Sequence, residues 1–141
     1  MNDNVIKELN AFLEGNYMAI HGYEKYIQHI KDPNIKNELQ KIQQDHKTHA
    51  AKVAERIQNL GGMPVDGPGM KGMMSDIMNK LKGTSDDTQF IIKDACQGEY
   101  KGIEMAEEIV KGDLDPDSKK MIELILDKDR SHVIMLDKLI H

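Results

Sequence analysis

Residues 43–57, with the sequence QQDHKTHAAKVAERI, lie in the middle of a predicted helix and contain the histidines His46 and His49. The residues of one helix stripe recur around this pair at steps of three, four or seven, which is typical of a face that packs on a partner. The stripe consists of Ile35, Leu39, Ile42, His46, His49, Val53 and Leu60. Two imidazoles therefore stand where the pattern predicts aliphatic side chains. Because residues three apart share a helix face, both rings can reach one point in the interior of a bundle.

The composition is that of a soluble globular protein, with 39% hydrophobic and 30% charged residues among 141. We expect residues 1–141 to form a single domain, because a chain of this length can bury a core of its own. The formal charge of −5 and the lack of a basic block argue against nucleic acid or an acidic membrane as partner. Cys96 is the only cysteine, which excludes an internal disulfide and a thiolate zinc site and suits a reducing cytosol. With neither a signal-peptide pattern nor a run of about 20 apolar residues, we expect a cytoplasmic protein.

Capping residues, glycines and prolines divide the chain into four long predicted helices. The first is predicted over 4–31 and ends before Pro33; the second runs over about 34–60 and ends at Gly61 and Gly62. The third begins with a cap at Thr84 or Ser85 and ends at Gly112, and the fourth begins with Asp115 as N-cap and Pro116 at the first helical position. Residues 61–83 are rich in glycine and methionine, with a short helix predicted over 70–81. This connection is long enough to cross the full height of a bundle.

Each predicted helix carries one apolar stripe, and each stripe is interrupted near its midpoint by polar residues. The interruptions are Asn16 in the first helix, His46 and His49 in the second, Glu99 in the third, and Asp129 and His132 in the fourth. The midpoints of helices in an up-down bundle lie at one level, so these six residues are expected to meet in one layer of the core. Burying them unpaired would cost several kcal/mol each, more than the ~5–15 kcal/mol by which a domain is stable. Imidazole and carboxylate together are ligands for iron, zinc or manganese.

The order of these residues resembles the ferritin-like superfamily, and specifically bacterioferritin and rubrerythrin-type domains, in which acid-x-x-His pairs on two helices combine with one ligand from each of the others. The similar segments are 16–23 (NYMAIHGY), 46–50 (HKTHA), 99–102 (EYKG), 121–126 (MIELIL) and 129–132 (DRSH). The resemblance covers nearly the whole chain. It implies an all-α, ferritin-like four-helix bundle with a long crossover between the second and third helices.

The site departs from the family pattern, because Asn16, His46 and Asp129 stand where the family has glutamate. Two carboxylates remain of four, which leaves too little negative charge to offset two neighbouring divalent ions. We therefore expect one metal ion per chain, iron or zinc, held by His46, His49, Glu99, Asp129 and His132, with water or Asn16 nearby. The resemblance alone implies a link to iron handling or oxidative stress and, if there is activity, a reaction with oxygen or peroxide.

Other interpretations of the same residues stay open. An isolated His-x-x-His pair is more often hydrogen-bonded or at the surface, and an Asn in a stripe often selects helix register. A metal-free bundle that acts as a structural or interaction module is the main alternative, and iron storage in a cage is a weaker one. Methionines over 63–78 could bind copper(I), although an amphipathic cap on the bundle is favoured. We expect a homo-oligomer, with a dimer favoured, and a separate protein as any electron donor, since no rubredoxin-type cysteine set is present.

Overall fold

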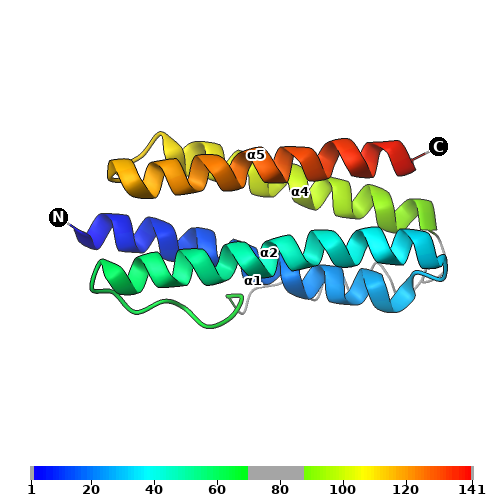
Figure 1. Cartoon of the computed structure of the whole chain (residues 1–141), viewed down its shortest axis with the longest axis horizontal. Coiled ribbons are helices and arrows are strands. Elements are labelled where there is room, and N and C mark those ends of the chain that lie inside the picture. Colours follow the sequence, from blue (N-terminus) through cyan, green and yellow to red (C-terminus); the bar gives the residue numbers. More distant parts are fainter. Residues whose placement is uncertain (1, 70–87, 141) are drawn as a thin grey trace.

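A computed structural model of the chain describes residues 2–69 and 88–140, and these form four helices. They are α1 (Asn2–His29), α2 (Pro33–Asn59), α4 (Thr88–Val110) and α5 (Pro116–Leu139). Figure 1 shows them side by side as an elongated bundle. The predicted all-α four-helix architecture is confirmed for the described part of the chain. The predicted short helix over 70–81 and the predicted cap at Thr84 or Ser85 lie outside the described residues.

The helix ends lie where turn-forming residues predicted them. Asp32 caps α2 by accepting hydrogen bonds from the backbone N–H of Asn34 at 2.8 Å and of Ile35 at 3.3 Å. At the other end of α2, Gly61 has φ +88°, a left-handed conformation that glycine adopts without steric cost. Asp115 caps α5 in the same way as Asp32 caps α2, with Pro116 at the first helical position. Local sequence therefore accounts for both tight starts and for one helix end.

The order of the helices requires a long connection between α2 and α4. Helix α1 packs on α2 and on α4, while α5 packs on α4 and, over fewer contacts, on α2. Figure 1 shows α2 and α4 running in the same direction, so the chain must return along the bundle between them. Residues after α2 begin this return along the outside of the bundle (Figure 1). The predicted crossover between the second and third helices is thereby confirmed.

The core follows the predicted stripes closely on three helices and less closely on α1. On α2, α4 and α5 the stripe residues in the middle of each helix are buried. The stripe that contains Asn16 runs along α1 at steps of three and four, and its members Ile6, Ile20 and Ile27 are only half-buried. Val5, Phe12 and Tyr26, which lie outside that stripe, are buried. The buried face of α1 is therefore displaced by about one residue from the predicted stripe, since Val5, Phe12 and Tyr26 each directly precede a stripe position. Each fully buried Leu or Ile contributes roughly 1.5–3 kcal/mol to this core.

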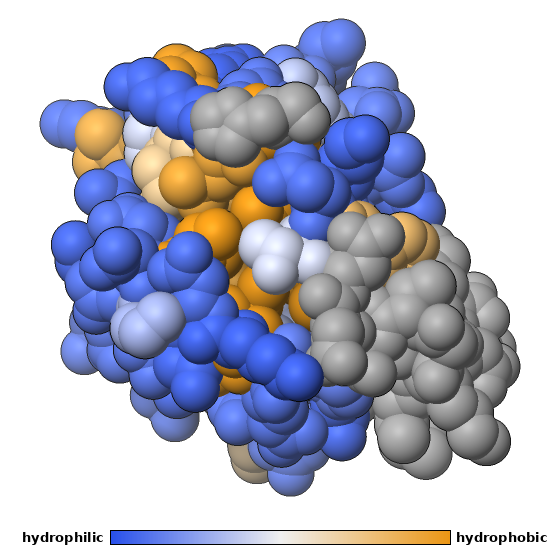
Figure 2. Space-filling view, turned by 90° about the vertical axis from the view of Figure 1, so that its right-hand side faces the viewer, coloured by the Kyte–Doolittle hydropathy of each residue, from blue (hydrophilic) through white to orange (hydrophobic). Residues whose placement is uncertain are grey.

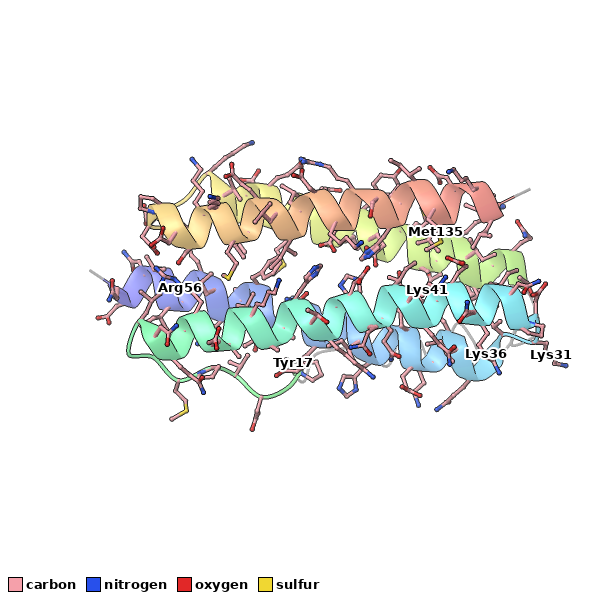
Figure 3. All side chains as sticks on the ribbon, viewed as in Figure 1. Tyr17, Lys31, Lys36, Lys41, Arg56 and Met135 are labelled. Atoms are coloured by element: carbon pink, nitrogen blue, oxygen red, sulfur yellow. The ribbon has the colours of Figure 1, made fainter. Side chains whose placement is uncertain are left out.

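The outer faces of the helices are polar. Figure 3 shows Lys36 and Lys41 projecting from α2 and Lys31 from the turn before it. Figure 2 shows the end of the molecule that lies on the right in Figure 1. There, polar residues (blue) surround a central strip of apolar residues (orange). Within residues 2–69 and 88–140, no helix has the length and apolarity needed to cross a membrane.

Candidate metal centre

Six polar side chains are buried together halfway along the bundle. They are Asn16, His46, His49, Glu99, Asp129 and His132, and none is more than 8% exposed. They come from all four helices, as the interrupted stripes predicted. Burial of so many polar groups is costly unless they bond to one another or to a ligand. The contacts within this layer, which we call the polar layer, show which groups are satisfied.

Glu99 is the most fully bonded member of the polar layer. Its Oε2 accepts hydrogen bonds from the Nε2–H of His46 and from the hydroxyl of Tyr23, both at 2.7 Å. Its Oε1 accepts from the Nδ1–H of His132 at 3.1 Å. Burial would raise the pKa of Glu99, but the two imidazoles outweigh it and lower this pKa to about 2. Glu99 is therefore a carboxylate at neutral pH, held by side chains from three other helices.

The donor atoms of the layer are close together, and three of those at and around Asp129 are unpaired. One donor atom each of His46, Glu99, Asp129 and His132 lies within 4.8 Å of all the others. Asp129 Oδ1 is 3.9 Å from Nδ1 of His46, 3.9 Å from Nδ1 of His49 and 3.5 Å from Nδ1 of His132. Among these, Asp129 Oδ1 and the Nδ1 atoms of His46 and His49 have no hydrogen-bond partner. Unpaired buried atoms of this kind are rare, and each calls for an explanation.

The spacing of these atoms fits ligands around one ion. Four N or O donors at 2.0–2.2 Å from a tetrahedral ion lie roughly 3.3–3.6 Å from one another. The three separations from Asp129 Oδ1, 3.5 to 3.9 Å, are close to that range. Three imidazole nitrogens and one carboxylate oxygen are also a ligand set that zinc and iron accept. The chemistry and spacing of these residues therefore fit a bound metal ion.

Burial shifts the pKa values of Asp129 and His49. Burial raises the pKa of Asp129 to about 6, since the nearby imidazoles compensate for it only in part and Glu99 adds repulsion. Burial, together with the charges of His46 and His132, lowers the pKa of His49 to about 4. His49 is thus a neutral imidazole at pH 7, which is the form that binds metal. At pH 7 the neutral imidazole of His49 therefore lies 3.9 Å from Asp129, whose ionised form is disfavoured by burial.

Asp45 supports this layer from its edge, and the stripe pattern did not identify it. Its Oδ2 accepts a hydrogen bond from Nε2 of His132 at 2.8 Å and lies 3.8 Å from the ammonium of Lys128. This bond turns Nδ1 of His132 toward Asp129 and Glu99 and, with Glu99, raises the pKa of His132 despite its burial. A carboxylate behind a histidine is a common way of orienting a metal ligand. The one sequence signal was an acidic residue directly before His46.

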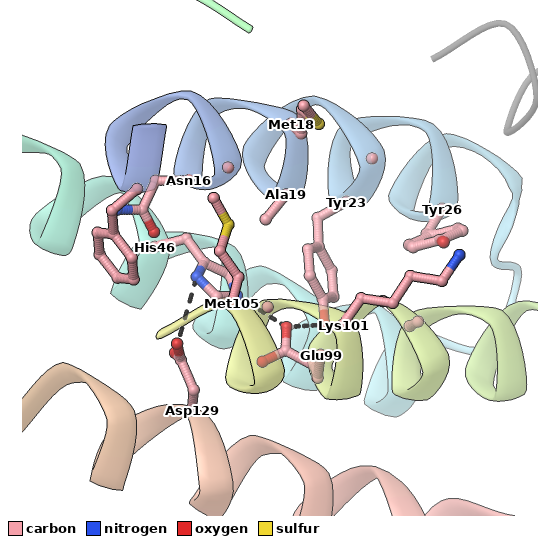
Figure 4. A pocket seen from close by; sticks show the side chains of 16 residues that line it. Asn16, Met18, Ala19, Tyr23, Tyr26, His46, Glu99, Lys101, Met105 and Asp129 are labelled. Carbon is pink, nitrogen blue, oxygen red and sulfur yellow. Dashed lines mark hydrogen bonds and ion pairs between the residues drawn. The ribbon is translucent and has the colours of Figure 1, made fainter. Parts of the chain in front are cut away.

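Tyr23, Tyr17 and Asn16 lie on α1, the helix diagonally opposite α5 in the bundle. Tyr23 is buried, and its hydroxyl donates a hydrogen bond to Glu99, so it belongs to the polar layer as well as to the core. Tyr17 does not share this position, since it is only half-buried on α1. Asn16 is buried and lines a cavity together with His46, Glu99 and Asp129, as Figure 4 shows, and its Nδ2 has no partner.

Comparison with known proteins gives a family but no activity. The chain matches the family described as "Domain of unknown function (DUF2383)" over residues 4–112. The matched region contains α1, α2 and α4 and ends before α5, which carries Asp129 and His132. No curated protein matches the chain. Since the match spans more than half of the 141 residues, the chain belongs to the DUF2383 family.

Proposed function

We propose that this protein binds one divalent transition-metal ion, iron or zinc, in the polar layer of a ferritin-like bundle. The observation that carries the proposal is the set of buried donor atoms without partners around Asp129 Oδ1. A bound ion would satisfy all of them at once. No described side chain offers Asp129 Oδ1 a hydrogen bond in its place.

We assign Nδ1 of His46, Nδ1 of His49 and Asp129 Oδ1 as ligands, because all three lack a hydrogen-bond partner. Nδ1 of His132 donates to Glu99 Oε1, so it would join them only by losing that proton when an ion binds. Glu99 lies beside these atoms, offsets charge and holds the ring of His46 through its Nε2–H. Two carboxylates offset the charge of one divalent ion but not of two. A bound zinc would supply a Lewis acid at this point, and a bound iron would supply redox chemistry toward oxygen or peroxide.

Three features support the ferritin-like assignment as a proposal. The bundle has a long crossover between α2 and α4, and the polar layer draws on all four helices. His46 and His49 lie three residues apart on α2, and Asp129 and His132 lie three residues apart on α5. A link to iron handling or oxidative stress rests on this resemblance alone.

A metal-free bundle is the second candidate function, as a structural or interaction module. It is favoured by the complete bonding of Glu99, which accepts from Tyr23, His46 and His132 without any ion. In that case the unpaired atoms of Asp129 and His49 would be satisfied by water.

Elemental analysis combined with thermal unfolding tests the proposal on untagged wild type, on His49→Ala and on His21→Ala, with and without chelator. His21 is an exposed histidine of α1 and provides the matched control. We expect about one iron or zinc per chain for wild type and His21→Ala and none for His49→Ala. At a free metal concentration of 100 times Kd, the bound ion should stabilise the fold by about 2.7 kcal/mol, and chelator should remove this gain.

The outcomes separate the two candidates. Two equivalents of metal per chain would contradict a single ion. A metal-free wild type whose unfolding temperature does not respond to chelator or to added metal would overturn metal binding and leave the metal-free bundle.

A further inference from the structure

A cavity between α1 and α4 leads from the surface to the polar layer. Its volume is about 250 Å³, and Figure 4 shows side chains of both helices around it. Small residues make up much of its wall, with Gly15, Ala19 and Gly22 from α1 and Gly98 and Gly102 from α4. Small residues often let two helices approach closely, but here a space remains between them.

Two of the glycines have no structural requirement in the described residues. Gly98 and Gly102 lie one turn apart inside α4, and a Cβ added at either position would meet no described atom within 4 Å. Glycine destabilises the interior of a helix relative to alanine, so each position weakens α4 without relieving a clash. Among residues 2–69 and 88–140, no atom therefore occupies the space next to these two glycines.

The inner end of the cavity offers one hydrogen-bond donor and one acceptor that are free. Asn16 is only 5% exposed, lines the cavity, and its Nδ2 has no partner. Asp129 Oδ1 lines the same end and is also unpaired. A hydroxyl group can accept from an amide and donate to a carboxylate. An anionic head group is disfavoured there, because Glu99 and Asp129 both carry carboxyl groups at this end.

The remaining wall suits an aromatic body. Phe12, Tyr23 and Tyr26 line the cavity together with Met18 and Met105. The exposed Lys101 of α4 contributes the one basic side chain besides His46 among the described lining residues. Aromatic rings and thioethers both make favourable contacts with a bound ring. A cavity of about 150 Å³ suffices for benzene in an engineered protein, so about 250 Å³ accommodates one ring with a short substituent.

We propose that this cavity binds a compact, uncharged molecule that carries one hydroxyl group on an apolar, aromatic body. The body lies between α1 and α4 over Gly98 and Gly102, and the hydroxyl faces Asn16 and Asp129. The inference goes beyond metal binding and does not depend on it, since the cavity and its unpaired Asn16 are present without an ion.

Ligand-observed NMR titration tests the proposal with benzyl alcohol, its apolar analogue toluene and its anionic analogue benzoate. Wild type is measured both as purified and after chelation, so that failure of the metal proposal is distinguishable from failure of this one. We expect saturable binding of benzyl alcohol with a Kd on the order of 1 mM or tighter, at least tenfold weaker binding of toluene, and no binding of benzoate.

Variants locate the ligand within the molecule. Gly102→Leu and Gly98→Leu fill the cavity and should weaken benzyl alcohol binding at least tenfold, without lowering the unfolding temperature, because leucine favours a helix over glycine. Asn16→Leu should remove most of the preference for benzyl alcohol over toluene. Glu104→Leu, on the exposed side of α4, is the matched control and should bind as wild type does.

Several results would overturn the proposal. These are no saturable binding to wild type up to about 10 mM, unchanged binding by both leucine variants of the α4 glycines, or equal affinity for benzyl alcohol and toluene. If wild type binds nothing and Gly102→Leu changes the mass measured by sedimentation, the cavity is covered by a second copy of the chain. If wild type binds nothing and the mass is unchanged, another segment of the chain fills the space.

Discussion

Replacing Asp129 by asparagine should stabilise the metal-free protein while weakening its response to metal. The pKa of Asp129 is raised from 3.8 to about 6, principally because burial penalises the ionised carboxyl. At about 1.4 kcal/mol per pKa unit, ionised Asp129 reduces the free energy of unfolding at pH 7.5 by about 3 kcal/mol. This figure already includes the attraction of His46 and His132, so an uncharged asparagine should recover much of it, a net gain of about 1–3 kcal/mol. For a chain of this size the gain corresponds to an increase in unfolding temperature of roughly 3–9 °C.

The advantage of Asp129→Asn should depend on pH with a defined sign. Because the folded-state pKa of Asp129 lies above the unfolded value, the folded protein binds the proton more tightly between pH 3.8 and about 6. The penalty in wild type is therefore complete above pH 7 and is relieved as the pH falls through 6. At pH 5 the advantage of the variant should be about half of that at pH 7.5, and near pH 4 it should disappear. Taking the difference between the two proteins cancels the titration of residues that they share.

The assay is urea unfolding of wild type and Asp129→Asn at pH 7.5, 6 and 5, in chelator and again with added zinc. Zinc should stabilise wild type by a few kcal/mol and the variant by much less. Asp127→Asn is the control, because Asp127 has a 73% exposed side chain that pairs with Arg130 at the surface and should change stability by less than about 0.5 kcal/mol. If Asp129→Asn destabilises the chelated protein by more than 1 kcal/mol at pH 7.5, the carboxylate holds the polar layer together and the reasoning is refuted.

Three further predictions concern residues around the polar layer. Tyr23→Phe removes the hydroxyl that donates to Glu99 at 2.7 Å and should lower the free energy of unfolding in urea by about 1–3 kcal/mol. The control Tyr100→Phe, at a 49% exposed residue, should not change it measurably, and equal effects of the two variants would contradict the buried bond. Asp45→Asn weakens the hydrogen-bond acceptor of His132 Nε2 and should reduce zinc affinity about 10- to 100-fold in a competition titration with a fluorescent chelator. An unchanged affinity would exclude His132 as a ligand oriented by Asp45. Burial, together with Asp137, raises the pKa of the Cys96 thiol to about 11. Iodoacetamide at pH 8 should therefore modify Cys96 far more slowly in the native protein than in the urea-unfolded protein, and comparable rates would show that the thiol is accessible.

The cavity and the metal ligands share His46 and Asp129, so the two proposed sites should influence each other. A bound ion would take Asp129 Oδ1 and leave a hydroxyl ligand with Asn16 alone. Benzyl alcohol should then bind more weakly to zinc-loaded wild type than to the chelated protein, and by reciprocity should weaken zinc binding by the same factor. The Asn16→Leu variant, which already lacks the amide, provides the comparison.

Sequence alone determined the helices and the level at which their polar residues meet. Caps such as Asp32 and Asp115 and the left-handed Gly61 act within a few residues, so their effects can be read along the chain. A stripe of period three and four assigns a helix face wherever one partner covers it, which is why His46, His49 and Glu99 were expected in the core and lie there. The crossover followed from the length of the connection.

Tertiary structure decided which side chains complete the polar layer and what space remains beside it. Tyr23 and Asp45 approach it from other helices, and no local period specifies which rotamer reaches a residue 76 or 87 positions away. Helix α1 buries Val5, Phe12 and Tyr26 in place of Ile6, Ile20 and Ile27, because the packing of the bundle decides which flank of an apolar stripe is covered. The cavity over Gly98 and Gly102 exists only because α1 and α4 leave a gap there, and a gap between two helices depends on how they pack, which neither sequence segment encodes by itself.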